Sequence, residues 1–117
     1  MLLHGFLENS TMWNDLKPTL LLNHRVISVD LLGHGQTGCL GYIHTMSDMA
    51  NAVLAVLQHV GLESYVLIGH SMGGYVALNL AKKKPASILG LCLMNSTAMD
   101  DNPEKKQNRN RAIEALK

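Results

Sequence analysis

Residues Ile68–Leu78 read IGHSMGGYVAL, and this stretch decides how the sequence is interpreted. An apolar run typical of a buried strand leads into it, and a helix-like pattern of apolar residues follows. Ser71 stands at the junction, with Gly69 and Gly73 two residues away on either side. The pattern G-x-S-x-G at such a junction predicts a sharp strand-to-helix turn that exposes the serine hydroxyl at the end of a sheet.

A turn of this kind explains the two glycines. We expect a strained backbone with positive φ at Ser71, and the residues two before and two after it come too close for side chains. The amide of Met72 begins the following helix, so it has no intrahelical partner and is free to donate to an oxyanion. Ser71 is therefore the candidate catalytic nucleophile.

Apolar runs elsewhere in the chain predict further strands. Each is apolar on both faces, which predicts strands covered on both sides, as in a parallel sheet. The runs lie at residues 25–32 (RVISVDLL), 65–70 (YVLIGH) and 88–95 (ILGLCLMN).

Helical patterns lie between these runs. A helix is expected near residues 13–22, another from the capping box Thr45–Asp48 to a stop at Gly61, and a third over 72–84. The alternation of strand and helix predicts an α/β fold with a mostly parallel sheet and helices on both faces.

A second element lies near the start of the chain. His4-Gly5-Phe6 follows a short apolar strand end at Leu2-Leu3 and precedes a polar loop. In this arrangement the Phe6 amide can supply another oxyanion donor. We interpret His4 as a residue that braces the loop by hydrogen bonds, not as a catalytic one.

The segments LLHGF (2–6), DLLGHGQT (30–37) and LIGHSMGGYVAL (67–78) together resemble the α/β-hydrolase fold family in their order and spacing. The turn sequence G-H-S-M-G-G is most similar to the esterase and lipase-like branch. The resemblance implies that the Leu2-Leu3 strand lies between the second and third strands.

The resemblance also implies a reaction. In it, Ser71 attacks a carbonyl, the amides of Phe6 and Met72 stabilise the oxyanion, and a histidine held by an acid moves the proton. The implied partner is a small-molecule acyl substrate, with no cofactor and no metal. A serine argues against the branches that use an aspartate nucleophile, such as dehalogenases and epoxide hydrolases.

The sequence departs from the family at the catalytic base. The family's order is serine, acid, histidine, but all six histidines precede Ser71: His4, His24, His34, His44, His59 and His70. Asp100 and Asp101 fit a helix-entry loop better than a catalytic acid. Both ends of the chain look cut, so we expect a partial hydrolase core over residues 1–96. Residues 97–117 are expected to begin a helical cap or linker.

The sequence raises two other hypotheses about function. GHGQTG (33–38) matches G-x-G-x-x-G, but no helix opens after it, so dinucleotide binding is not expected. A non-catalytic member of the family, acting as a ligand-binding or interaction module, is the rival to an enzyme. The intact turn at Ser71 disfavours it, because drift would be expected to erase a strained serine.

The composition argues against some classes of binding partner for this protein. The chain has 117 residues, 47% of them hydrophobic, and a net charge of +1, which argues against nucleic acid or an anionic membrane. No apolar run approaches the length of a membrane span. Cys39 and Cys92 are expected to be reduced thiols, Cys92 within a buried strand. With no leader pattern, the expected compartment is the cytoplasm.

Overall fold

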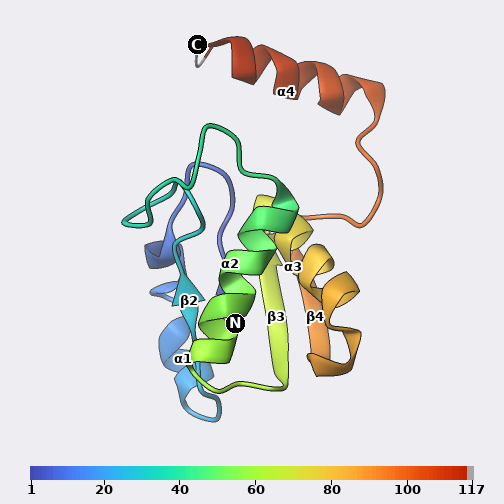
Figure 1. Cartoon of the computed structure of the whole chain (residues 1–117). Coiled ribbons are helices and arrows are strands. Elements are labelled where there is room, and N and C mark those ends of the chain that lie inside the picture. Colours follow the sequence, from blue (N-terminus) through green and yellow to red (C-terminus); the bar gives the residue numbers. More distant parts are fainter. Residues whose placement is uncertain (116–117) are drawn as a thin grey trace.

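A computed structural model describes residues 1–115 and contains one parallel sheet with the strand order β2-β1-β3-β4 (Figure 1). The strand that begins the chain lies between the second and third strands, as the family resemblance implied. The predicted α/β architecture is confirmed. The strands are β1 (Leu2–Leu3), β2 (Ser28–Val29), β3 (Tyr65–His70) and β4 (Ile88–Met94).

Helices lie on both faces of the sheet. One face is covered by α2 (Met46–His59) and α3 (Met72–Lys83), which bury Leu67 of β3. On the other face, Leu20 of α1 (Lys17–Leu21) lines a pocket together with Val66. The remaining helices are η1 (Ser10–Trp13), η2 (Pro85–Ser87) and α4 (Pro103–Ala115).

Local sequence signals set the ends of α2. The Thr45 hydroxyl accepts a hydrogen bond from the Asp48 amide at 3.1 Å, and the Asp48 carboxylate accepts one from the Thr45 amide at 2.9 Å. The predicted capping box is thus present. Gly61, with φ of 68°, lies just beyond the helix end, where a left-handed residue is common.

The strand predicted over residues 25–32 is much shorter than expected. Only Ser28–Val29 pairs, because the neighbouring strand β1 is itself only two residues long. Beyond this pair, the Leu31 amide donates to Nε2 of His4 at 2.9 Å instead of to a strand. The apolar run therefore continues as a buried loop anchored by a side chain.

The expectation that β4 is covered on both sides, with Cys92 buried, is wrong for the described residues. Leu89 is 71% exposed, Leu91 is 40% exposed and Cys92 is exposed. The reason is that β4 is an edge strand of the four-stranded sheet and pairs only with β3. Cys39 is also exposed, and both thiols are free.

No helix within residues 1–115 combines the length and apolar character needed to cross a bilayer.

The first turn of α3 packs directly on the backbone of the sheet. A Cβ atom on Gly73 would collide with the carbonyl oxygen of Leu3 and lie 2.6 Å from that of His4. A Cβ atom on Gly69 would collide with the Gly73 carbonyl oxygen and lie 2.6 Å from the Cα of Gly74. Both glycines are therefore required by close approach, as predicted.

The loops at the carboxyl ends of the strands are tied together by Asp30, the residue after β2. Its Oδ1 accepts a hydrogen bond from the Ser10 amide at 2.7 Å, and its Oδ2 accepts one from the Gln36 amide at 2.9 Å. Gly35 has φ of 54°, and a Cβ atom there would collide with the Asp30 carboxylate. The amide hydrogen bonds from Gln36 and Ser10 lower the pKa of Asp30 to about 2.

We predict that Gly73→Val destabilises the protein by roughly 3 kcal/mol, because the backbone of β1 cannot move away from a branched side chain. The measurement is the urea midpoint followed by circular dichroism. Gly38→Val is the matched control, since no atom lies within 4 Å of a Cβ atom built on Gly38. Equal loss of stability in both variants would contradict the close-approach argument.

We predict that Asp30 contributes to acid sensitivity. Its folded pKa of about 2 lies below the ordinary value of 3.8, so its stabilisation is complete above the ordinary value and is lost as the pH falls through 2. Asp30→Asn removes one of two acceptors. The substitution should lower the free energy of unfolding by on the order of 1–3 kcal/mol at pH 7. The free energy of unfolding should also fall less steeply between pH 4 and pH 2, values that bracket the folded and ordinary pKa values of Asp30.

Unfolding midpoints measured against pH test this expectation, with the exposed Asp15→Asn as the control. An unchanged pH profile in Asp30→Asn would show that Asp30 does not couple these loops to folding.

Candidate active site

Ser71 has the strained conformation that the sequence predicts. It stands between the last residue of β3 and the first of α3, with φ of 49° and ψ of −113°. Its amide donates to the Met94 carbonyl at 3.0 Å, and its own carbonyl accepts from the Ser96 hydroxyl at 2.8 Å. These bonds to the end of β4 hold a backbone conformation that a non-glycine residue otherwise avoids.

Two of the backbone amides near Ser71, both predicted as oxyanion donors, have no hydrogen-bond acceptor among residues 1–115. One is the amide of Met72, the first of α3. The other is the amide of Phe6, in the loop of residues 4–8 that follows β1, called here the β1 loop. Unpartnered amides of this kind are the groups that can stabilise an oxyanion.

The direction of the Phe6 amide is set by its own peptide unit. The Gly5 carbonyl, in the same unit, accepts hydrogen bonds from Nδ1 of His4 at 2.7 Å and from the Glu8 amide at 3.3 Å. In a trans peptide the N–H points opposite to the C=O. The Phe6 N–H is therefore turned away from these donors and left free.

His4 braces this loop, as predicted. Its side chain is fully buried, and its Nε2 accepts from the Leu31 amide, so the proton lies on Nδ1. Desolvation by burial lowers the pKa of His4, with the Gly5 carbonyl acting in the opposite direction. A neutral imidazole with both nitrogens engaged cannot serve as a catalytic base.

One pocket of about 440 Å³ brings the three predicted site residues together. Ser71, Met72 and Phe6 all line it, at the carboxyl ends of the parallel strands, where ligands of α/β proteins bind. The other lining residues, which sequence reasoning did not identify, are Met46, Tyr75, Arg109, Ala112 and Ile113.

Helix α4 supplies three of these additional residues and lies beyond the carboxyl ends of the strands (Figure 1). Arg109 fastens it there. The Arg109 guanidinium lies 2.6 Å from the Asp101 carboxylate, donates to the Tyr75 hydroxyl at 3.0 Å and stands 5.3 Å from the centroid of that ring. The sequence led us to expect that residues 97–117 begin a helical cap or linker, but it carried no signal of where this helix packs.

No histidine within residues 1–115 hydrogen-bonds to Ser71. Nδ1 of His34 donates to the Leu32 carbonyl at 3.0 Å, and Nε2 of His44 accepts from the Leu40 amide. Asp101 is engaged by Arg109, in keeping with its interpretation as part of a helix-entry loop. A base and an acid for Ser71 are therefore not found in the described part of the chain.

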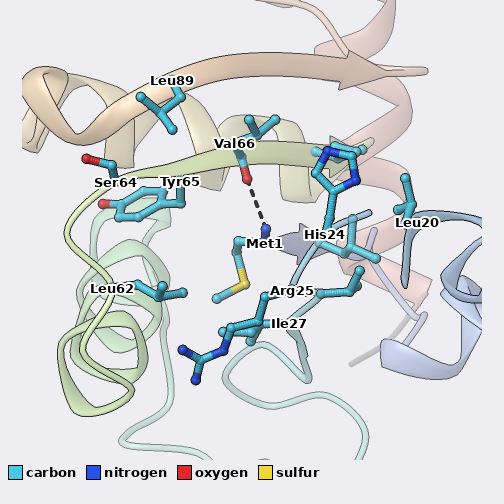
Figure 2. A pocket seen from close by; sticks show the side chains of 13 residues that line it. Met1, Leu20, His24, Arg25, Ile27, Leu62, Ser64, Tyr65, Val66 and Leu89 are labelled. Carbon is cyan, nitrogen blue, oxygen red and sulfur yellow. Dashed lines mark hydrogen bonds between the residues drawn. The ribbon is translucent and has the colours of Figure 1, made fainter. Parts of the chain in front are cut away.

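A second pocket, of about 310 Å³, is lined by residues at the end of the sheet opposite to Ser71. Figure 2 shows this pocket from close by. Its lining is mainly apolar and includes Met1, Tyr65 and Leu89, at the amino ends of three strands. The Met1 ammonium there donates to the Val66 carbonyl at 2.9 Å. This pocket contains none of the predicted site residues.

Neither a metal centre nor a dinucleotide site is found in the part of the chain that the structure describes. No group of three or more His, Cys, Asp or Glu side chains there could hold a metal ion. The Gly33–Gly38 segment closes on itself through a hydrogen bond from the Gly33 amide to the Gly38 carbonyl, and α2 begins only at Met46.

The chain is similar to several proteins of known class. A pimeloyl-[acyl-carrier protein] methyl ester esterase of Neisseria meningitidis is 37% identical over 107 residues, which cover 88% of this chain and 40% of that protein. A dihydrolipoyllysine-residue acetyltransferase component of an acetoin cleaving system from Pseudomonas putida is 35% identical, over 86% of this chain and 27% of that protein.

Among solved structures, a thermophilic esterase from Thermogutta terrifontis matches with a TM-score of 0.89 and 40% identity. The match covers 98% of this chain and 43% of the esterase. The chain thus spans less than half the length of these three relatives. The family model of the alpha/beta hydrolase fold matches residues 1–113, and the chain belongs to the α/β-hydrolase fold family.

Proposed function

We propose that this chain is the nucleophile-bearing part of a serine hydrolase that acts on carboxylic esters or related acyl bonds. The observation that carries the proposal is one pocket that holds the strained Ser71 beside two unpartnered amides, those of Phe6 and Met72. The esterases among its relatives support the same reaction class.

In the proposed reaction, the Ser71 hydroxyl attacks the acyl carbon and its oxygen forms a bond to that carbon. The electrons of the carbonyl double bond move to the carbonyl oxygen, and the amides of Phe6 and Met72 stabilise the resulting oxyanion. The serine proton must pass to a base, which later protonates the leaving group. Water then releases the acyl group from Ser71. We assign the base and its acid to no residue of this chain.

The lining of the pocket favours a small molecule with an apolar acyl group. Phe6, Met46 and Met72 contribute apolar surface, and Ile113 adds more from α4. A volume of about 440 Å³ lies in the range of small-molecule sites. No nucleic acid or cofactor is part of the proposal. Two free, exposed cysteines suit a reducing compartment, and we propose the cytoplasm.

A non-catalytic role is the second candidate. The observation that favours it is the absence of any hydrogen bond from a described histidine to Ser71. In that case the same pocket would bind a small apolar ligand without turnover. Activity of the protein extended to the natural ends of its gene separates the two candidates.

We predict that the 117-residue chain alone is at least about 10⁴-fold less active than the extended protein. A serine hydroxyl without a base is a weak nucleophile, and loss of a triad leaves only binding and oxyanion effects. The measurements are turnover of a chromogenic short-chain ester and labelling by a fluorophosphonate. Ser71→Ala in the extended protein should abolish both.

Ser64→Ala is the matched control, since Ser64 lines the pocket at the opposite end of the sheet (Figure 2). Rapid labelling of Ser71 in the short chain would mean that an upstream histidine serves as base, His34 first, because both nitrogens of His4 are engaged. An extended protein without turnover or labelling would favour the non-catalytic candidate.

A further inference from the structure

We propose that Glu8 is a positioning residue for the oxyanion site: its carboxylate fastens the β1 loop to the strand end that carries Ser71, and so holds the Phe6 amide in place. This inference rests on the proposed function, because it assigns Glu8 a role in the same acyl-transfer site. Glu8 does not line the pocket of Ser71 and would act only through the loop.

A single oxygen of Glu8 joins two parts of the site. Its Oε2 lies 2.6 Å from the Gly5 amide nitrogen and 2.9 Å from Nδ1 of His70. His70 ends β3 and directly precedes Ser71 in the chain. Because an ionised carboxylate only accepts hydrogen bonds, His70 carries its proton on Nδ1. The carboxylate therefore links the β1 loop to the serine turn across 62 residues of sequence.

The Glu8 carboxylate and the His70 ring pack so closely against Gly5 that no side chain fits at this position without displacing them. A Cβ atom on Gly5 would lie 2.6 Å from Oε2 of Glu8 and 3.0 Å from Nδ1 of His70. Gly5 is buried, so its amide would lose its only described acceptor if the carboxylate were removed. A buried N–H without an acceptor is strongly disfavoured, and the loop would have to move to satisfy it.

The β1 loop also contains a strained residue whose conformation needs support. Leu7 has φ of 61°, in the left-handed region that a bulky side chain rarely adopts. This conformation turns the chain back, so that the Glu8 amide reaches the Gly5 carbonyl and the Glu8 side chain reaches the Gly5 amide. Strained residues persist only where their surroundings hold them.

Both backbone polar groups of Gly5, the residue directly before Phe6, are thereby held. His4 and the Glu8 amide fix the Gly5 carbonyl, and the Glu8 carboxylate fixes the Gly5 N–H. Burial opposes ionisation of Glu8, but hydrogen bonds from His70 and the Gly5 amide outweigh it and lower the pKa of Glu8. The link is therefore a carboxylate at neutral pH.

The test compares Glu8→Ala, Glu8→Asp and Glu8→Gln in the extended protein, with Glu63→Gln as the control on an exposed glutamate. Glutamine keeps the length and an oxygen that can accept both hydrogen bonds, whereas aspartate keeps the charge but is one methylene short. If Glu8 acts by position, kcat for a short-chain ester should fall about 10- to 100-fold in Ala and Asp. KM should stay within about twofold, because an oxyanion donor acts mainly in the transition state.

Under the same proposal, Glu8→Gln should stay within about threefold of the unaltered protein. Fluorophosphonate titration counts the folded sites, so lost stability is not mistaken for lost kcat. Full activity in both Glu8→Ala and Glu8→Asp would overturn the proposal. Activity that is retained in Glu8→Asp but lost in Glu8→Gln would also overturn it, because the effect would then come from the charge of Glu8 and not from its position. If the Ala variant does not fold, the contrast between Asp and Gln decides.

A second readout separates this inference from the proposed function. Amide hydrogen exchange of Gly5, followed by NMR, should be at least about 10-fold faster in Glu8→Ala and Glu8→Asp than in Glu8→Gln, because the first two lack an acceptor within reach. If the unaltered extended protein has no turnover, the proposed function fails. The role of Glu8 is then judged by exchange alone, and equal exchange of the Gly5 amide in Glu8→Ala, Glu8→Asp and Glu8→Gln would overturn it.

Discussion

The rest of the structure depends on the close approach between the first turn of α3 and the backbone of β1 and β3. Gly73 lies against the carbonyl groups of Leu3 and His4, and Gly69 lies against Gly73 itself. Because α3 lies so close to β3, a single residue must make the sharp turn from the strand into the helix. Ser71 is that residue, and its positive φ follows from the packing on both sides of it.

The same contact brings the two oxyanion donors to one place. Because α3 rests on β1, the loop after β1 must leave the sheet beside the serine turn, and Phe6 joins Ser71 and Met72 in one pocket. His4 and Asp30 then fix this region from the side of β2, through the amides of Leu31 and Gln36. The site is thus assembled by backbone contacts and buried polar anchors, before any substrate is present.

The parts of the fold and of the site that the residues alone predict are those that depend on neighbours in the chain, whereas the place of β1 between β2 and β3 was implied by the family resemblance. The serine turn, the free Met72 amide and the Thr45–Asp48 capping box all arise within a few residues. Other features depend on which distant segments of the chain pack against each other, and a local apolar pattern does not predict such packing. These features are the length of β2, the exposure of β4 and the position of Arg109. The sequence did not indicate a role for Glu8 for the same reason, since its partner His70 is 62 residues away.

Backbone strain is gathered at the end of the sheet that carries the site. The three non-glycine residues with positive φ in the described chain are Leu7, Ser71 and Asn95, and they follow β1, β3 and β4. After β2 the left-handed positions are glycines. Asparagine tolerates this conformation, whereas leucine and serine adopt it only where other contacts require it. Those contacts are the α3 packing at Ser71 and the carboxylate link beside Leu7. Ser71 lines the pocket itself, and Leu7 directly follows Phe6, which lines the same pocket.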